Sequence, residues 1–529
     1  MSRTAARHQL RALPAAASTM TVVAAAALPV LVTTWTILDP TPAVWRHLWA
    51  TRLPGMLVDT IVLLVVVVAG ALVLGTGLAW LVTAWQFPGR RALGWLLVTP
   101  LAMPGYVLGY VWLDTLQDPL GPRAVRSLWL CGLVLVLTLY PYVYLFARAS
   151  FRELSASSVD VGRSLGCTPA RVWWRVVLPM SRPALAAGAA LVGMEVLSDV
   201  GTVRLFNVST VADGVLRVWF GTGDRKAATE LSVLLIVLAA VLLAVERFTR
   251  GRARYGHADR RSGIVPQQLG GWRAGAAAAV GWGVLAIAVA VPIARLLAWA
   301  FEARRSGQAE TVAGDLGFHL LSSLRVAGLA AIACLTVGLV LAAALDPRRR
   351  VPAAASRLAT LGYVVPGPVV AIGVLVVLAA LDRSGWLPGG MLLVGSLAGL
   401  VYALVVRFLA VAHQGIESSF GKVPTSVVDS VRTLGAGRLR VLTGIKLPLS
   451  ATGIMAAGVV VAIDIVKDLP ITLLLRPFGT ETLPVWVWQA TSESLWVQAS
   501  VPSLALVAVG MVLVGALVWA FEHGAPPTS

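Results

Sequence analysis

Long apolar segments separated by short polar stretches form the main pattern along this chain. Each segment runs for about 20 residues, the length at which a helix crosses the hydrocarbon core of a bilayer. Inside lipid, a helix satisfies its own backbone N–H and C=O groups. The pattern therefore predicts an all-α integral membrane protein with about twelve transmembrane helices, six in each half. The segments are about Thr19–Leu38, Met56–Trp85, Ala92–Leu116, Leu128–Ala147, Pro183–Val203, Thr229–Phe248, Ala274–Phe301, Leu320–Leu345, Ala359–Leu381, Met391–Ala412, Thr452–Leu475 and Val501–Phe521.

Composition supports the same fold class. Hydrophobic residues make up 58% of the chain, charged residues only 13%, and the mean hydropathy is +0.82. A soluble domain of this length does not need so much apolar sequence to bury a core. The N-terminal Arg3, Arg7 and Arg11 precede an apolar run long enough to span, without a clear cleavage site, so we expect an uncleaved first helix.

The net charge of +18 indicates topology rather than nucleic-acid binding. Most basic residues fall on one side when the N-terminus is placed in the cytoplasm, and cytoplasmic loops carry the excess of Lys and Arg. The strongest clusters, Arg247 to Arg261 and Arg348 to Arg350, fall on that inner side. We therefore expect a multi-pass protein of the bacterial inner membrane with both termini cytoplasmic, basic anchors facing lipid headgroups, and no nucleic-acid partner. The three cysteines have no metal-ligand spacing, and we expect no metal site.

One pattern occurs twice, with an offset of 269 residues. The first copy begins at Asp160 and closes at Leu178-Pro179, and the second begins at Asp429 and closes at Leu447-Pro448. Because the offset is close to half of the chain, the repeated unit is half the protein. We expect a first repeat over residues 1–250 with its loop at 148–182, a cytoplasmic linker over 251–273, and a second repeat over 274–529 with its loop at 413–449.

Each loop carries its own helical signals. In the first loop, Ser155 can cap a short helix that stops at Gly166, a residue that tolerates positive φ. Thr168-Pro169 then reads as the start of a second short helix that ends near Leu178-Pro179. In the second loop, Pro424 opens a helix that closes at Gly435. The sequence predicts a folded knob of two short helices in each half.

These loops resemble the cytoplasmic loop of the permease subunits of ATP-binding-cassette (ABC) importers. That pattern has Glu-Ala-Ala, three residues, Gly, nine residues, Ile, one residue and Leu-Pro. Asp160 and Asp429 take its acidic position, and Val161-Gly162 or Ser430-Val431 replace the alanines. The later positions match in both copies. They are Gly166 and Gly435, Val176 and Ile445, and Pro179 and Pro448.

The resemblance implies a MetI-like permease fold and a coupling role for the loops, seated on an ABC ATPase dimer at the cytoplasmic face. It also implies an extracytoplasmic solute-binding protein. No phosphate-binding loop is present in the sequence, so ATP and Mg would bind the partner and this chain would carry no cofactor and no catalytic residue. The expected coupling residues are Asp160, Arg163, Leu165, Gly166, Leu178, Pro179, Asp429, Arg432, Leu434, Gly435, Leu447 and Pro448.

Five ionisable residues fall well inside predicted helices. Glu195 and Asp199 lie in the fifth helix, and Asp464, Lys467 and Asp468 lie in the eleventh, with both acidic pairs in the 269-residue register. Charges inside a membrane usually face a bundle interior or a watery cavity, which favours a shared translocation pathway. A local ion-pair network, or a position near the outer interface, is the alternative.

Two further features bear on the pathway. Pro104-Gly105 and Pro366-Gly367 occupy related places in the third and ninth segments, where they can interrupt a helix or merely kink it. The tyrosines allow two interpretations: oxygen ligands for a hard cation, or an aromatic belt at the membrane interface. They are Tyr106, Tyr110, Tyr140, Tyr142 and Tyr144.

A single chain with two coupling loops most resembles the ferric-iron permease family. The segments that carry this resemblance are Pro141 to Leu145, Asp199 to Val203, and Leu216 to Phe220. Thiamine, polyamine and inorganic-anion importer permeases are alternatives within the superfamily. Outside it, an ion-coupled secondary transporter would also have two halves and buried carboxylates. A membrane enzyme would need a catalytic constellation, and the sequence presents none.

Overall fold

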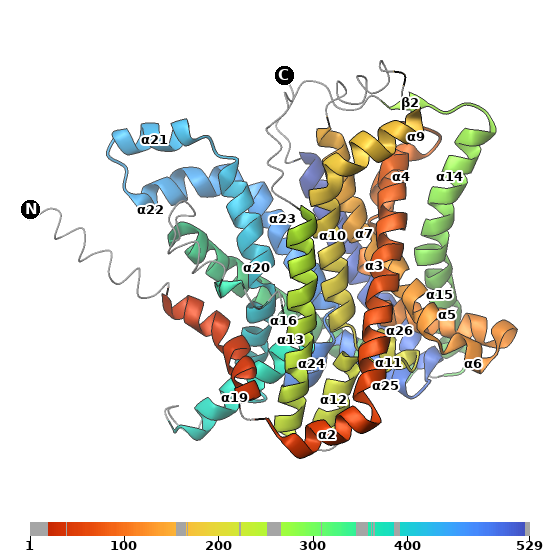
Figure 1. The fold of residues 1–529 in the computed structure, drawn as a ribbon, viewed down its shortest axis with the longest axis vertical. Coiled ribbons are helices and arrows are strands. Elements are labelled where there is room, and N and C mark those ends of the chain that lie inside the picture. Colours follow the sequence, from red (N-terminus) through yellow and green to blue (C-terminus); the bar gives the residue numbers. More distant parts are fainter. Residues whose placement is uncertain are drawn as a thin grey trace, which may run out of the picture.

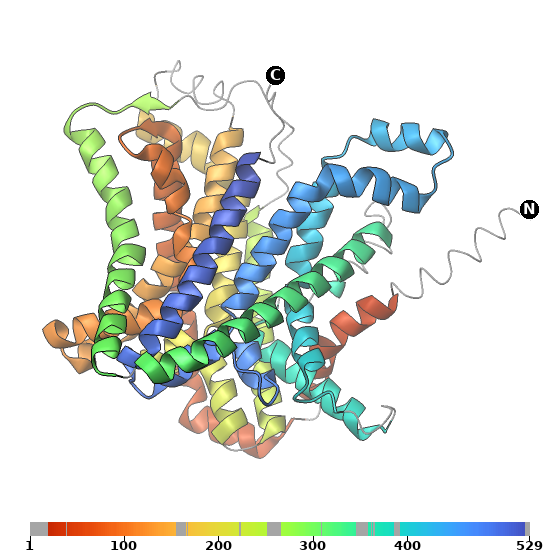
Figure 2. The ribbon, with the colours of Figure 1, turned by 180° about the vertical axis from the view of Figure 1, so that it is seen from behind.

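The computed structural model describes residues 20–38, 40–154, 166, 168–221, 224–250, 266–307, 309–344, 358–360, 362, 365–385 and 392–523. Figures 1 and 2 show a bundle of long helices, with short helices at both ends. Among the described residues, nine helices are long and apolar enough to cross a membrane. The long elements are α3 (Leu53–Ala84), α7 (Leu128–Glu153), α10 (Leu178–Ser198), α13 (Arg225–Arg250), α14 (Trp272–Leu285) continuing into α15 (Val291–Arg305), α16 (Ala309–Ala344), α20 (Leu397–Gly421), α23 (Leu447–Val466) and α26 (Trp496–His523).

Shorter elements connect these helices or cover their ends. They are η1 (Thr36–Leu38), α2 (Pro42–Thr51), α4 (Arg90–Leu96), η2 (Thr99–Ala102), α5 (Gly105–Leu120), α6 (Pro122–Val125), α9 (Pro169–Val172), η3 (Trp173–Val177), α11 (Gly201–Leu205), α12 (Val211–Gly221), η4 (Ala286–Ala290), α19 (Gly367–Arg383), α21 (Thr425–Thr433), α22 (Arg438–Val441), η6 (Leu442–Lys446), α24 (Pro470–Leu475) and α25 (Leu483–Ser492). One two-residue parallel pair joins β1 (Trp85–Gln86) to β2 (Gln267–Gln268).

The all-α membrane fold is confirmed, but twelve unbroken spans are not present in the described parts. The first segment forms a shorter apolar helix, Met20–Trp35, and the ninth forms α19. The third segment is broken, with a bend of 92° between the helices over Arg90–Ala102 and Gly105–Leu120. The break has a local cause: Met103 is extended because Pro104 follows it, and helix restarts only at Gly105.

The fifth and eleventh segments are also broken, which corrects the expected position of three charged residues. Asp199 is extended after the end of α10, and Lys467 and Asp468 follow the end of α23. Asp199 Oδ1 accepts hydrogen bonds from the amides of Thr202 and Val203, at 2.9 and 3.1 Å. Such capping bonds start a new helix, α11, and Asp468 caps α24 in the same way through the Ile471 amide.

The glycines of both loops have the backbone that the sequence predicts. Gly166 has φ +76° and Gly435 has φ +86°. After α9 begins at Pro169, the Arg171 amide donates to Thr168 Oγ1 at 3.4 Å, a helix-capping bond. In the second loop, α21 begins directly after Pro424 and projects from the bundle with α22 (Figures 1 and 2). Asp160, Arg163 and Leu165 lie outside the described residues.

The sequence predicts that the second short helix of the first loop ends near Leu178-Pro179, but this helix continues past the pair. Its counterpart in the second loop does the same. Each continues through a π-helical turn into the long helix, as η3 into α10 and as η6 into α23. The Leu178 amide reaches back five residues to the Trp173 carbonyl, and the Leu447 amide reaches Leu442 in the same way. The wider turn lets the chain pass the following proline, which offers no N–H and would clash in a regular α-helical turn.

The two halves are intertwined. The first helix of the chain packs on α19 of the second half, where Gly373 allows the Pro29 carbonyl to approach; a Cβ there would lie 2.5 Å from that oxygen. In return, α15 packs on α5 of the first half, and Arg295 forms a 2.9 Å ion pair with Asp114. Neither half therefore packs as an independent unit, and the repeat boundaries stay a sequence prediction.

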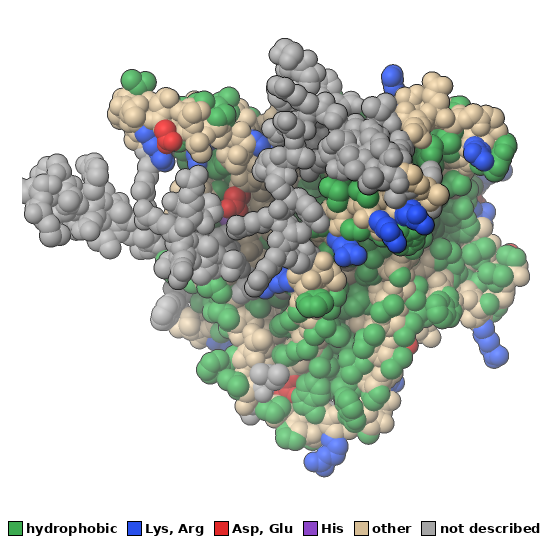
Figure 3. Space-filling model, turned by 45° about the horizontal axis from the view of Figure 1, so that its top comes forward, with side chains coloured by type: hydrophobic (Ala, Val, Ile, Leu, Met, Phe, Trp, Pro, Cys, Tyr) green, Lys and Arg blue, Asp and Glu red, His purple; other side chains and the backbone are tan. Residues whose placement is uncertain are grey.

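The outer surface of the bundle fits a lipid environment. Figure 3 shows a broad hydrophobic surface on the lower part of the molecule and basic side chains gathered above it. Large apolar side chains are strongly exposed on several long helices, including Val73, Phe248, Leu321 and Val512. In lipid these side chains lie in an apolar solvent, so their exposure carries no hydrophobic penalty.

Close packing of α3 on α7 depends on Gly75. A Cβ at this position would lie 2.8 Å from the Tyr140 carbonyl oxygen and 2.9 Å from the Tyr144 amide nitrogen. We expect Gly75→Val to separate the helices and lower the free energy of unfolding by about 1–3 kcal/mol, the usual cost of overpacking. Thermal unfolding in detergent measures the change. Gly77 of the same helix has no atom within 4 Å of such a Cβ. Gly77→Val is the matched control, and equal destabilisation by both changes would contradict the prediction.

Candidate translocation site

A cavity of about 90 Å³ lies where the broken helices of the two halves meet. Both halves contribute to its wall, through the breaks after η2, α10 and α23 and through α7 and α20. Its lining residues are Leu101, Met103, Pro104, Gly105, Tyr106, Leu135, Thr138, Leu139, Glu195, Ser198, Asp199, Val200, Gly201, Arg407, Phe408, Asp464, Lys467, Asp468, Leu469 and Pro470. All five ionisable residues predicted for the pathway are among them.

The acidic residues reach the cavity from equivalent positions of the two repeats. Glu195 near the end of α10 corresponds to Asp464 near the end of α23, and Asp199 corresponds to Asp468 in the following breaks. Because each break ends one helix and starts another, its carboxylate caps the second helix while it lines the cavity. The repeat therefore places four carboxyl groups around one space.

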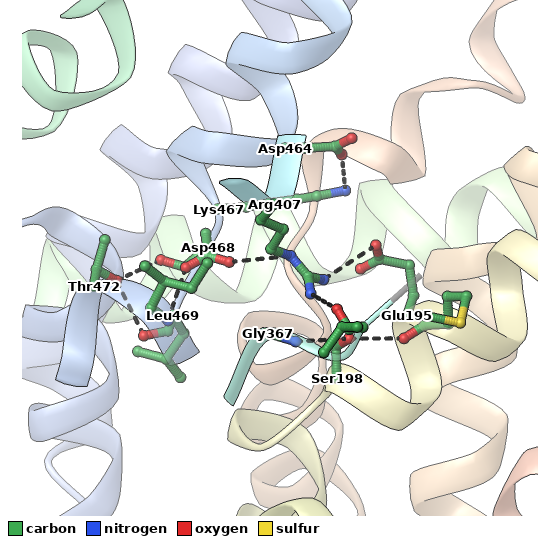
Figure 4. A network of polar contacts seen from close by, with 12 residues as sticks. Glu195, Ser198, Gly367, Arg407, Asp464, Lys467, Asp468, Leu469 and Thr472 are labelled. Atoms are coloured by element: carbon green, nitrogen blue, oxygen red, sulfur yellow. Dashed lines mark hydrogen bonds and ion pairs between the residues drawn. The ribbon is translucent and has the colours of Figure 1, made fainter. Parts of the chain in front are cut away.

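Arg407 is the functional candidate that sequence reasoning missed. It lies on α20, is only 5% exposed, and forms part of the cavity wall. Its Nη2 lies 3.8 Å from Glu195 Oε1, and its Nε lies 3.9 Å from Asp468 Oδ1. Figure 4 shows the guanidinium between these two carboxylates. The available signal was an arginine within the apolar segment Met391–Ala412, since a charge within a transmembrane segment is itself an indication of function.

Lys467 forms a second, tighter group. Its Nζ lies 3.0 Å from Asp464 Oδ1 and donates to Tyr142 Oη at 3.0 Å. The Tyr142 hydroxyl donates in turn to Asp464 Oδ1 at 3.2 Å. Tyr142 belongs to the first half and the other two residues to the second, so this group also joins the halves.

The two Pro-Gly pairs adopt the same local structure. Pro104 and Pro366 precede the first residue of α5 and α19, with extended ψ angles of 143° and 146°. Gly105 lines the cavity, and a Cβ on it would lie 2.6 Å from Thr202 Oγ1. The Gly367 amide donates to Ser198 Oγ at 3.3 Å, across the two halves. Each pair therefore starts a helix at the central site, whereas its part in transport stays a prediction.

The five tyrosines do not form an interfacial belt, because their side chains are buried in the bundle. They are no more than 8% exposed. Tyr110 donates to Ser503 Oγ at 3.0 Å and Tyr144 donates to the Gly94 carbonyl at 2.8 Å, so both hydroxyls serve packing. Of the five, Tyr106 lines the cavity directly and Tyr142 reaches its acids.

Both sequence interpretations of the buried charges describe part of this site. The residues line a shared central cavity, and they also form ion pairs. No group of three or more His, Cys, Asp or Glu side chains within the described ranges is arranged to hold a metal ion. The site is therefore a mixed-charge cavity, in which two basic side chains oppose four acidic ones.

The two repeated loops connect to this cavity through α10 and α23. Each described Leu-Pro pair, Leu178-Pro179 and Leu447-Pro448, lies at the start of the long helix whose other end carries the cavity acids. On α21, Asp429 and Arg432 are exposed and lie 3.9 Å apart, while Leu434 beyond it is 86% exposed. The second loop thus presents an uncovered tip, and a rigid helix joins that tip to the central site.

The pair Asp464 and Lys467 provides a test of this network. We expect Lys467→Met to lower the free energy of unfolding by about 3–5 kcal/mol, because it leaves the Asp464 charge buried without its partner. The double variant Lys467→Met with Asp464→Asn removes both charges and recovers most of that loss. Thermal unfolding of the purified chains measures both effects. If the double variant is no more stable than the single one, the loss of stability does not come from the unpaired charge of Asp464.

Comparison with known proteins gives the same class as the geometry. Residues 71–246 match the family described as binding-protein-dependent transport system inner membrane component. Over 468 residues the chain is 24% identical to the Fe(3+)-transport system permease protein FbpB 2 of Haemophilus influenzae, covering 87% of this chain and 88% of that protein.

Shorter similarities are found to permeases with other named substrates. The sulfate transport system permease protein CysT of Escherichia coli is 27% identical over 202 residues, covering 35% of this chain and 71% of that protein. The molybdate/tungstate transport system permease protein WtpB of Thermococcus kodakarensis is 24% identical over 183 residues, covering 34% and 72%. The family match over residues 71–246, the similarity along both halves and the multi-pass helical fold together support a permease of a binding-protein-dependent ABC importer.

Proposed function

We propose that this permease imports ferric iron, received from an extracytoplasmic binding protein and driven by a separate ATPase. The observation that carries the proposal is the similarity to a ferric-iron permease along 87% of the chain, which extends over both halves. The sulfate and molybdate relatives align with only about a third of it. A cavity with four acidic and two basic side chains also suits a cation better than an anion.

The coupling loops are the proposed seats of the ATPase dimer. Gly166 and Gly435 both have positive φ, Gly435 follows the end of α21, and each loop continues through a π-helical turn into α10 or α23. A rigid connection of this kind passes rigid-body motion of an ATPase into the membrane, whereas a slack loop would absorb it. ATP and Mg would bind the partner, because the sequence contains no phosphate-binding loop.

The proposed orientation places both loops in the cytoplasm. In Figure 1, α21, α22 and α9 lie toward the upper end of the bundle, as does β2. The basic side chains in Figure 3 gather near the same end, as expected for the inner face. The binding protein would then dock at the opposite end, where α2, α12 and α25 lie.

Reconstitution tests the assignment. We expect proteoliposomes containing this chain and its ATPase, supplied with the binding protein, to take up radiolabelled ferric iron only with ATP. An ATPase unable to hydrolyse ATP is the control, and excess sulfate, molybdate, thiamine or putrescine should leave uptake unchanged. Uptake by the chain alone, driven by a proton or sodium gradient, would favour a secondary transporter. Uptake of one of the competing solutes instead would refute the iron assignment.

The loop glycines test the coupling. We expect Gly166→Val with Gly435→Val to preserve the membrane fold but lower uptake per ATP hydrolysed by roughly tenfold or more. A β-branched residue at positive φ costs about 1–3 kcal/mol, and each 1.4 kcal/mol corresponds to a tenfold change.

The matched control is Gly437→Val, two residues from Gly435. Gly437 has an ordinary φ, and a Cβ added to it would have no atom within 4 Å. Coupled transport at the native ratio in the double variant would count against the loops as the ATPase contact.

A further inference from the structure

The acidic residues of the central cavity occur at equivalent positions in both repeats, but the basic residues do not. Glu195 and Asp464 correspond, as do Asp199 and Asp468. In the first half, Thr138 occupies the position that corresponds to Arg407 (407 − 138 = 269). Ser198 occupies the position that corresponds to Lys467 (467 − 198 = 269). The structure has the same offset, because α7 begins at Leu128 and α20 begins at Leu397, which are also 269 residues apart. Both cations thus come from the second repeat, where the first has hydroxyl groups.

The two basic residues are held differently. Lys467 Nζ lies 3.0 Å from both Asp464 and Tyr142. Arg407 lies farther from its carboxylates, at 3.8 and 3.9 Å, and its Nη1 donates a hydrogen bond to the Val365 carbonyl at 3.3 Å. Its Nε is buried without a hydrogen-bond partner among the described residues. A buried guanidinium is normally retained by short, forked hydrogen bonds to a carboxylate, and the distances to both carboxylates are too long for such bonds.

Arg407 also lies between carboxylates of the two halves. Its guanidinium lies between Glu195 of the first half and Asp468 of the second (Figure 4), so it links the two helix breaks. Gly367 permits this placement, because a Cβ there would lie 3.2 Å from Arg407 Nη1. Without Arg407, the two carboxylates would face the cavity as unpaired buried charges, which is costly.

We propose that Arg407 is a tethered counter-ion of the translocation pathway. It neutralises Glu195 and Asp468 and joins the two halves while the pathway is empty, and a cationic cargo displaces it from these two carboxylates during passage. This inference rests on the proposed function in taking the cargo as a cation. The loose contacts of Arg407 fit exchange, and its return limits how tightly the cargo is held, since tight binding would oppose release.

The test measures cavity access without iron. Thr138→Cys places a thiol in the cavity wall at the repeat position of Arg407, in a chain whose Cys131, Cys167 and Cys334 are replaced by alanine. The rate of modification by a cationic methanethiosulfonate is compared with that by an anionic one, in the complex with the ATPase. We expect Arg407→Gln to raise the cationic rate relative to the anionic rate, because it leaves the negative charges of Glu195 and Asp468 facing the cavity without the guanidinium. The expected rise is about tenfold or more, which corresponds to about 1.4 kcal/mol. Arg407→Lys should keep the native ratio.

A triple variant separates this role from a merely structural one. Arg407→Gln with Glu195→Gln and Asp468→Asn removes the guanidinium and both of its carboxylates, so no unpaired charge is left behind. We expect this variant to be monodisperse and as heat-stable as the native chain, to lack the raised cationic-to-anionic ratio of Arg407→Gln, and to have no ferric-iron uptake. Native uptake by the triple variant, or an unchanged reagent ratio in Arg407→Gln, would overturn the proposal.

Failure of the proposed function has a different signature. A native complex without ATP-driven ferric-iron uptake would refute the iron assignment. The reagent ratio at the introduced thiol would still report the role of Arg407, because that measurement contains no iron. Arg295→Gln is the matched basic control, because its charge is paired with Asp114 at 2.9 Å and neither residue lines the cavity. An equal rise in the reagent ratio for Arg295→Gln would contradict a specific role of Arg407.

Discussion

Burying charge inside a membrane bundle is the constraint on which the centre of this protein depends. Carboxylates lost from water must gain cations or hydrogen bonds, and each half supplies only part of what the other needs. Arg407 of the second half faces Glu195 of the first, and Tyr142 of the first half contacts Lys467. The two repeats are therefore held together by electrostatics at the same place where their helices break.

The breaks both stabilise the fold and form the cavity wall. A carboxylate at each break caps the following short helix, so backbone amides freed by the interruption find a partner within the protein. Non-helical backbone is tolerated at this depth only where protein or a cavity surrounds it. The same residues that make the bend stable, Asp199 and Asp468, consequently line the central space.

Each long helix with cavity acids begins at one of the two repeated loops. The π-helical turns before Pro179 and Pro448 keep α10 and α23 continuous with the short helices α9 and α22. In the proposed mechanism, displacement of a loop is carried along one element to the carboxylates at its far end. Both halves have this connection, whereas the two basic residues of the cavity come from the second half alone.

Sequence alone determined the membrane class, the two repeats and the positive φ expected of Gly166 and Gly435, because hydrophobic length, register and glycine's backbone freedom are local properties. It also placed the acids in equivalent positions. Tertiary structure alone decided that these acids share one cavity, that Arg407 joins them, and that the tyrosines are buried rather than interfacial. Those facts depend on which helices pack together. The sequence does not determine this, because an apolar segment has the same composition whether it contacts lipid or another helix.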